Sequence, residues 1–311
     1  MIKSVNQLVT LRCHSKCFMC NIWKERNFRS EMCADDYKKL YSLPEFSEME
    51  DITISGGEPT EKFDLFEIVH AILASNSKSK SLFFCTNGTN QKKTLEFVSE
   101  FSSHVKEIFV CISIEGTPDI HNKIRGIKCY DTAVQTLDAL KELEYQNLQT
   151  IISSTILPEN GNKECLDHLH DLAEKTKSNH SFRLAAQSEI FYQNHETPIS
   201  KIRLSAEQIK FMGEYIHNHY WKNPFMKIQY DFIINKKSFL GTKENLKCLA
   251  GNISVFIKPD GKIYPCINSK RIIGNKNGIN NIPYKLGRME SCPCCTECQV
   301  YPMLNFSQYK T

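Results

Sequence analysis

Short apolar segments alternate with helical patterns through the first 221 residues, and this alternation restricts the chain to one class of fold. The segments are β-branched or aromatic and nearly all apolar, as expected for strands that are covered on both faces. Six strand–helix units in succession predict an α/β fold with a parallel sheet and right-handed crossovers. We expect strands over 4–12, 51–55, 81–86, 107–114, 148–156 and 181–186. We expect helices near 62–75, 91–101, 130–145, 162–176 and 205–221.

The pattern changes after residue 240, where short turns, Gly, Pro and Cys predominate. Asp260-Gly261 lies between two alternating segments of 254–266, which predicts a β-hairpin there. A tail of this size buries little apolar surface alone, so a metal or docking onto the main domain should stabilise it. We place the domain boundary at residue 235, giving domains of residues 1–235 and 236–311.

Charge and hydropathy exclude several classes of protein. The 39 basic and 35 acidic residues are spread along the chain without a basic block, so neither nucleic acid nor an anionic membrane is expected as a partner. The first residues, MIKSVNQLVTLR, lack the apolar core of a signal peptide, and no later stretch is apolar enough to span a bilayer. We therefore expect a cytoplasmic protein.

The cysteines are numerous and clustered. The chain has fourteen, of which nine form two groups. In a reducing compartment such clustering indicates metal or redox chemistry rather than disulfides. The groups are Cys13, Cys17 and Cys20, then Cys248, Cys266, Cys292, Cys294, Cys295 and Cys298.

The first group forms a CxxxCxxC loop directly after the first expected strand. Three thiolates can hold three irons of a cubane and leave the fourth iron without a protein ligand; soft thiolates suit iron–sulfur clusters and zinc alike. A zinc site normally requires two CxxC pairs or a nearby His, and His14 has the wrong spacing. The loop therefore favours an iron–sulfur cluster over zinc.

The sequence RCHSKCFMCNIWK around these cysteines resembles the cluster loop of the radical S-adenosylmethionine (SAM) superfamily. The resemblance implies a partial (β/α)6 TIM barrel and a [4Fe–4S] cluster whose open iron binds SAM. It also implies SAM cleavage to a 5′-deoxyadenosyl radical, driven by an external electron donor such as flavodoxin or ferredoxin. The family usually has an aromatic residue before the last Cys, where the backbone meets the adenine. Met19 stands there in this chain.

Further segments resemble the family's SAM-binding motifs and follow successive strands. Ser55-Gly56-Gly57-Glu58-Pro59-Thr60 is similar to the GGEP motif, in which the glycines let the backbone approach the methionyl amine. Thr86-Asn87-Gly88 is similar to a TNG segment that lines the pocket. Ser113 matches a serine that contacts the ribose, and Arg125 matches an arginine that meets the SAM carboxylate. These motifs lie at or after the C-terminal ends of expected strands, where α/β proteins bind ligands.

The second cysteine group resembles the twitch and SPASM domains of this superfamily. The spacing of Cys248 and Cys266 matches the opening of such a domain, but the late cysteines of a full SPASM domain are missing. The resemblance therefore implies one auxiliary [4Fe–4S] cluster, with zinc as the alternative. The expected ligands are Cys248, Cys266, Cys295 and Cys298, with Cys292 or Cys294 as possible substitutes for Cys295. Ile267 replaces the catalytic aspartate of the sulfatase-maturating relatives, so that activity is not carried over.

Other reactive side chains receive more ordinary interpretations. Cys85 and Cys111 lie inside expected strands, where a buried small apolar residue is favoured over a radical-quenching thiol. Glu115 and Glu189 end strands near the expected pocket and are the candidate substrate bases, with solvated loop carboxylates as the alternative.

These features predict an oxidoreductase-type radical SAM enzyme. We expect a dehydrogenase of a small hydroxylated molecule, in which the auxiliary cluster accepts an electron. Because the cluster loop begins at residue 13, no N-terminal leader-binding domain is expected, which favours the dehydrogenase over a peptide maturase that makes a crosslink, thioether or epimer. A non-catalytic iron–sulfur or zinc scaffold is the third alternative.

Overall fold

The computed structural model describes residues 1–76, 78–223 and 250–279. All six expected parallel strands are present, within a few residues of the predicted bounds. Neighbouring strands pair in parallel in the order of the sequence. The strands are β1 (Ser4–Thr10), β2 (Asp51–Gly56), β3 (Ser81–Thr86), β4 (Glu107–Ser113), β5 (Leu148–Ile156) and β6 (Asn179–Leu184).

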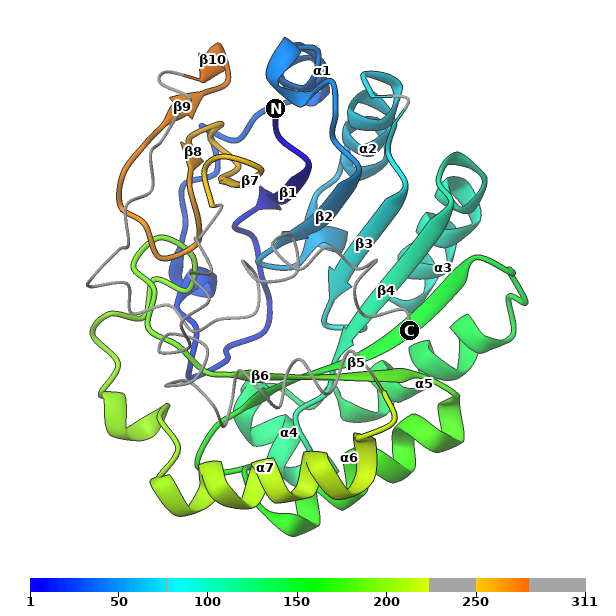
Figure 1. The fold of residues 1–311 in the computed structure, drawn as a ribbon, viewed down its shortest axis with the longest axis vertical. Helices are drawn as coiled ribbons and strands as arrows, with labels where there is room; N and C mark the ends of the chain where they lie inside the picture. The colour runs from blue at the N-terminus through cyan, green and yellow to red at the C-terminus, as the bar shows by residue number, and fades with distance from the viewer. Residues whose placement is uncertain (77, 224–249, 280–311) are drawn as a thin grey trace.

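Helices cover the outer face of this curved sheet (Figure 1). The five predicted helices are α2 (Leu65–Ala74), α3 (Gln91–Phe101), α5 (Tyr130–Lys141), α6 (Lys163–Thr176) and α7 (Ala206–Tyr220). The structure adds α1 (Ala34–Tyr41) and α4 (Pro118–Arg125), which the sequence analysis missed. Single-turn helices lie at Ile22–Lys24, Pro44–Phe46, Pro59–Glu61, Ser102–His104 and Ile199–Lys201. This arrangement is the partial (β/α)6 barrel that was expected.

The two faces of the sheet differ in chemistry. Phe84 of β3 faces the helices and stacks on Phe97 of α3 with ring centroids 3.9 Å apart. Residues on the opposite, inner face alternate with such core residues. They include polar, half-buried side chains such as Thr53, Ser153 and Thr155. The helix-facing side therefore holds the continuous apolar core, and the inner face mixes polar side chains with apolar ones.

The described part of the tail joins the same sheet. The hairpin predicted at Asp260-Gly261 is confirmed: β7 (Ser254–Ile257) pairs antiparallel with β8 (Ile263–Tyr264). β7 also pairs in parallel with β1, with Ser4 opposite Ser254. The short strands β9 (Gly274–Asn275) and β10 (Gly278–Ile279) complete the edge. The sheet thus continues beyond residue 235, and the division into two domains stays a prediction.

Over the described residues, no helix has the length and apolar character needed to cross a membrane.

Candidate functional site

The cysteine loop follows β1 directly and docks on the end of α4. The backbone amides of Lys16 and Phe18 donate to the carbonyls of Arg125 and Ile124, at 2.8 and 3.3 Å. Gly126 ends α4 with φ +66°, and a Cβ atom there would lie 2.6 Å from the Lys16 carbonyl oxygen. A glycine is therefore required where the loop meets the helix.

The three cysteines of this loop are free thiols, with Cys17 buried and Cys13 and Cys20 half-buried. Burial raises the pKa of both Cys13 and Cys20 to about 12, and it also raises the pKa of Cys17. The charge of Arg125 acts in the opposite direction on all three thiols. Burial therefore disfavours the thiolate form, and positive charge nearby, such as Arg125 or the irons of a cluster would supply, favours it.

The GGEP turn contacts the chain immediately before Cys13. Gly57 donates its backbone N–H to the Thr10 carbonyl at 2.8 Å, and the Glu58 amide donates to the Arg12 carbonyl at 2.7 Å. A Cβ atom on Gly57 would lie 2.3 Å from the Arg12 carbonyl oxygen. In this structure the glycine therefore permits a close backbone approach to the root of the cysteine loop.

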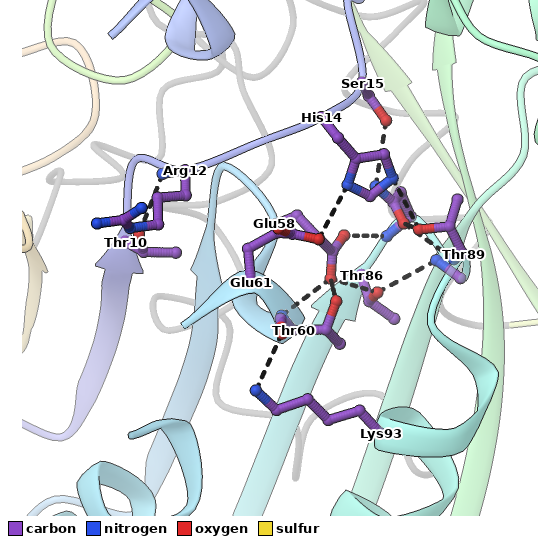
Figure 2. Close-up of polar contacts among 12 residues, drawn as sticks. Thr10, Arg12, His14, Ser15, Glu58, Thr60, Glu61, Thr86, Thr89 and Lys93 are labelled. Atoms are coloured by element: carbon purple, nitrogen blue, oxygen red, sulfur yellow. Dashed lines mark hydrogen bonds and ion pairs between the residues drawn. The ribbon is translucent and has the colours of Figure 1, made fainter. Parts of the chain in front are cut away.

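Glu58 joins the ends of β2 and β3 (Figure 2). One carboxylate oxygen accepts from the hydroxyls of Thr60 and Thr86, at 2.8 and 2.7 Å, and from the Thr60 amide at 3.1 Å. The other oxygen accepts from the Asn87 amide at 2.7 Å. Only 1% of Glu58 is exposed, so its carboxylate is fully engaged in holding the two motifs together.

The second turn, Thr86–Thr89, is tied to the cysteine loop by side chains (Figure 2). The Asn87 amide nitrogen donates to the Ser15 hydroxyl at 3.1 Å. His14 Nε2 lies 2.9 Å from the Thr89 hydroxyl, and His14 Nδ1 lies 3.1 Å from a Glu61 carboxylate oxygen. His14 thus bridges the two turns. Sequence reasoning weighed this residue only as a zinc ligand and missed the bridge.

Arg125 and Glu115 form a buried ion pair, with Nη1 and Oε1 3.1 Å apart and side chains 11% and 1% exposed. The other Glu115 oxygen accepts from the Thr155 amide at 2.7 Å. Burial raises the pKa of Glu115 even though Arg125 acts to lower it. Within the described residues, the buried Nε of Arg125 has no hydrogen-bond partner. That N–H is a donor available to an anionic ligand.

A loop after β6 connects the cysteine loop to the tail. The Asn194 amide nitrogen donates to the Met19 carbonyl at 2.7 Å, and its oxygen accepts from the Ser188 amide at 2.8 Å. The Ser188 hydroxyl donates to the Ile267 carbonyl, next to Cys266. No sequence signal pointed to this connection, because it depends on contacts between distant segments.

The remaining predicted residues are placed as follows. Met19 and Pro59 are buried, and Ser113 is half-buried at the end of β4. Cys266 is 4% exposed, whereas Glu189 is on the surface, where an ion pair with Lys270 lowers its pKa. Cys248, Cys292, Cys294, Cys295 and Cys298 lie outside the described residues.

Among the residues that the structure describes, no three His, Cys, Asp or Glu side chains converge closely enough to hold a single metal ion. A cubane differs from a single ion, since each thiolate binds a different iron. One loop with three free thiols beside a cationic side chain fits that donor set.

Comparison with known proteins agrees with this geometry. Residues 8–172, from β1 into α6, match the Radical SAM superfamily. The chain belongs to the radical SAM superfamily. It is accordingly a radical SAM enzyme, and the cofactors of the class are a [4Fe–4S] cluster and SAM.

Two curated relatives are similar over different lengths. The sporulation killing factor maturation protein SkfB of Bacillus subtilis is 22% identical over 83% of this chain and 58% of its own length. The Fe-coproporphyrin III synthase of Methanosarcina barkeri is 31% identical over 43% of this chain and 33% of its own length. The chain therefore spans little more than half of the first relative and a third of the second.

Solved structures share the fold. Streptococcus suis SuiB bound to the precursor peptide SuiA superposes with a TM-score of 0.63 at 17% identity, covering 88% of this chain and 62% of SuiB. The enzyme anSMEcpe with bound AdoMet and Cp18Cys peptide gives 0.62 at 14% identity, covering 90% of this chain and 79% of that one.

Proposed function

We propose that Cys13, Cys17 and Cys20 bind the [4Fe–4S] cluster and that the enzyme abstracts a hydrogen atom from a peptide. One observation carries the cluster assignment: the loop that bears the three thiols is held by hydrogen bonds from three sides. The GGEP turn, the Thr86–Thr89 turn and the end of α4 all hydrogen-bond to residues 10–18. When bound, the cluster supplies the electron that cleaves SAM to methionine and the 5′-deoxyadenosyl radical.

The chain's own side chains then bind and orient SAM. Arg125, held by Glu115, offers its buried Nε–H to the SAM carboxylate. Ser113, at the end of β4, is assigned to the ribose of SAM, and Asn87 lies beside the cysteine loop. Gly56, Gly57 and Pro59 form the turn for the methionyl amine, while Glu58 keeps that turn in place. The backbone of Met19 is assigned to contact the adenine of SAM.

The candidate substrate bases take other roles in this proposal. Glu115 is engaged by Arg125 and Thr155, so we assign it to positioning. Glu189 is paired with Lys270 on the surface. No catalytic base is assigned.

An auxiliary [4Fe–4S] cluster belongs to the same proposal, with Cys248, Cys266, Cys295 and Cys298 as ligands. Its support within the described residues is the burial of Cys266, which is 4% exposed. The neighbouring Ile267 is hydrogen-bonded to the loop that also holds Met19. The two cysteine-bearing segments are thus joined through Ser188 and Asn194.

The relatives favour a peptide substrate over the small hydroxylated molecule that the sequence analysis preferred. SkfB is named as a maturation protein, and it is similar over 83% of this chain. The solved structures of SuiB and anSMEcpe contain peptides and share the fold.

Cluster assignment is tested by anaerobic reconstitution with iron and sulfide, followed by SAM and dithionite, with 5′-deoxyadenosine measured by mass spectrometry. Wild type should form 5′-deoxyadenosine, Cys17→Ala should not, and Cys165→Ala, which removes a buried thiol on α6, should match wild type. Zinc instead of iron in the loaded wild type would refute the assignment.

Substrate class is tested by adding a synthetic peptide library or a set of aminocyclitols to the reconstituted enzyme. Peptides should accelerate 5′-deoxyadenosine formation and acquire a mass change. If aminocyclitols alone accelerated 5′-deoxyadenosine formation, the substrate would be a small hydroxylated molecule and the peptide proposal would be wrong.

A further inference from the structure

Two cysteines outside the cluster loop face each other across neighbouring strands. Cys85 of β3 and Cys111 of β4 are register partners in the parallel ladder. Register partners project from the same face of a sheet, and neighbouring strands are about 4.8 Å apart. Disulfides span Cα separations of about 4.4–6.8 Å, so the spacing of neighbouring strands lies within the range that a disulfide can bridge.

The pair lies on the inner face of the sheet. Phe84 points to α3, so Cys85, its neighbour in the strand, points the other way. Phe83 and Phe109, each two residues before one of the cysteines, lie on the same face and stack with ring centroids 4.4 Å apart. Two residues after the pair come Asn87 and Ser113 of the proposed SAM site.

The two cysteines differ in pKa and in exposure, which suits a reaction in which Cys85 reacts first and Cys111 second. A hydrogen bond from Cys111 lowers the pKa of Cys85, whereas the same contact and burial raise the pKa of Cys111. Cys85 is half-buried and Cys111 is only 6% exposed. The more exposed of the two residues is therefore also the one whose thiolate is favoured, and the second thiol is hydrogen-bonded to it.

The geometry points to Cys85 and Cys111 as a second reactive site, a redox-active dithiol that takes small disulfides as its ligand class. The Cys85 thiolate attacks the disulfide RSSR, forming a protein–SR mixed disulfide and releasing one RS⁻. Cys111 then attacks the Cys85 sulfur, forming the protein disulfide and releasing the second RS⁻. Overall, two protein thiols lose two electrons and two protons, and RSSR becomes two RSH.

The experiment treats the reconstituted holoenzyme anaerobically with oxidised glutathione, then alkylates and digests it with trypsin without reduction. Peptides 81–92 and 107–123 each contain one cysteine, Cys85 and Cys111. Wild type should give these peptides linked, with a mass two hydrogens below their sum, and dithiothreitol should separate them. Cys111→Ser should retain glutathione on Cys85, whereas Cys85→Ser should leave Cys111 unmodified.

Internal controls come from the same digest. Peptide 30–38 carries the exposed Cys33 and should be glutathionylated in every sample, while peptide 164–175 carries the buried Cys165 and should not be. The proposal is overturned if Cys33 reacts but wild type yields no linked peptide. It is also overturned if Cys85 stays unmodified in Cys111→Ser. Neither outcome bears on the cluster assignment, because the assay does not use SAM.

Discussion

The Glu115 carboxylate lies 3.1 Å from Arg125 Nη1, and together the two side chains join the end of β4 to the helix end on which the cysteine loop rests. Removing one partner of a buried pair leaves the other charge uncompensated. The ion pair is therefore the point at which a single substitution should affect both stability and SAM binding.

Glu115→Ala is expected to lower the free energy of unfolding by about 3 kcal/mol, because Arg125 then stays buried without its counter-charge. Urea unfolding measures this loss. Glu115→Gln keeps the shape and should raise the SAM concentration for half-maximal 5′-deoxyadenosine formation about tenfold, the equivalent of ~1.4 kcal/mol. Glu189→Gln, on the surface, is the matched control and should change neither quantity; equal effects from both glutamines would contradict the positioning role.

Glu58→Gln should be destabilising although it is nearly isosteric. The glutamine NH2 group replaces one carboxylate oxygen and cannot accept the hydrogen bonds made to it, which come from Thr60 and Thr86 at one oxygen and from the Asn87 backbone N–H at the other. Unsatisfied buried donors cost about 1–3 kcal/mol, measurable by chemical denaturation. Glu61→Gln, whose side chain is 41% exposed beside His14, should cost less than about 1 kcal/mol.

Gly57→Ala should reduce the iron bound per chain. Its Cβ would meet the Arg12 carbonyl oxygen at 2.3 Å and push the turn away from the root of the cysteine loop. Iron analysis after reconstitution measures the effect. Ser55→Ala, two residues earlier on β2, removes only a hydroxyl and should bind iron as wild type does. Full iron loading in Gly57→Ala would show that the close approach is dispensable.

His180 should make stability depend on pH. It is 2% exposed, and burial lowers its pKa from 6.5 to about 3. Below pH 6.5 the unfolded chain binds a proton at this histidine, whereas the folded chain does not. Lowering the pH therefore reduces the free energy of unfolding by up to about 1.4 kcal/mol per pH unit. His180→Asn should reduce that slope between pH 6 and 5 in urea titrations.

Sequence periodicity anticipated the strand and helix series because parallel strands are apolar over their whole length and the helices between them are amphipathic. It missed α4 although Pro118 begins this helix and Gly126 follows it, the usual signals for such a start and stop. A helix of eight residues was too short for periodicity to reveal.

Motif resemblance named segments that meet at the cysteine loop but not the contacts between them. It placed Glu58 in a SAM-binding motif, and the structure adds that both carboxylate oxygens accept hydrogen bonds from the chain itself. It paired neither Glu115 with Arg125 nor Ser188 with Ile267, since such contacts depend on three-dimensional packing rather than local sequence. The assignment of individual cysteines as cluster ligands stays a prediction.

The parallel pairing of β7 with β1 has a consequence for synthesis of the protein. Ser4 pairs with Ser254, which lies 250 positions later in the sequence, so this edge of β1 stays open until the later strand has left the ribosome. At about 5–20 residues per second, that interval lasts roughly 12–50 s. During this time an exposed strand edge adjoins the cysteine loop, and the sheet is complete only after β7 has been synthesised.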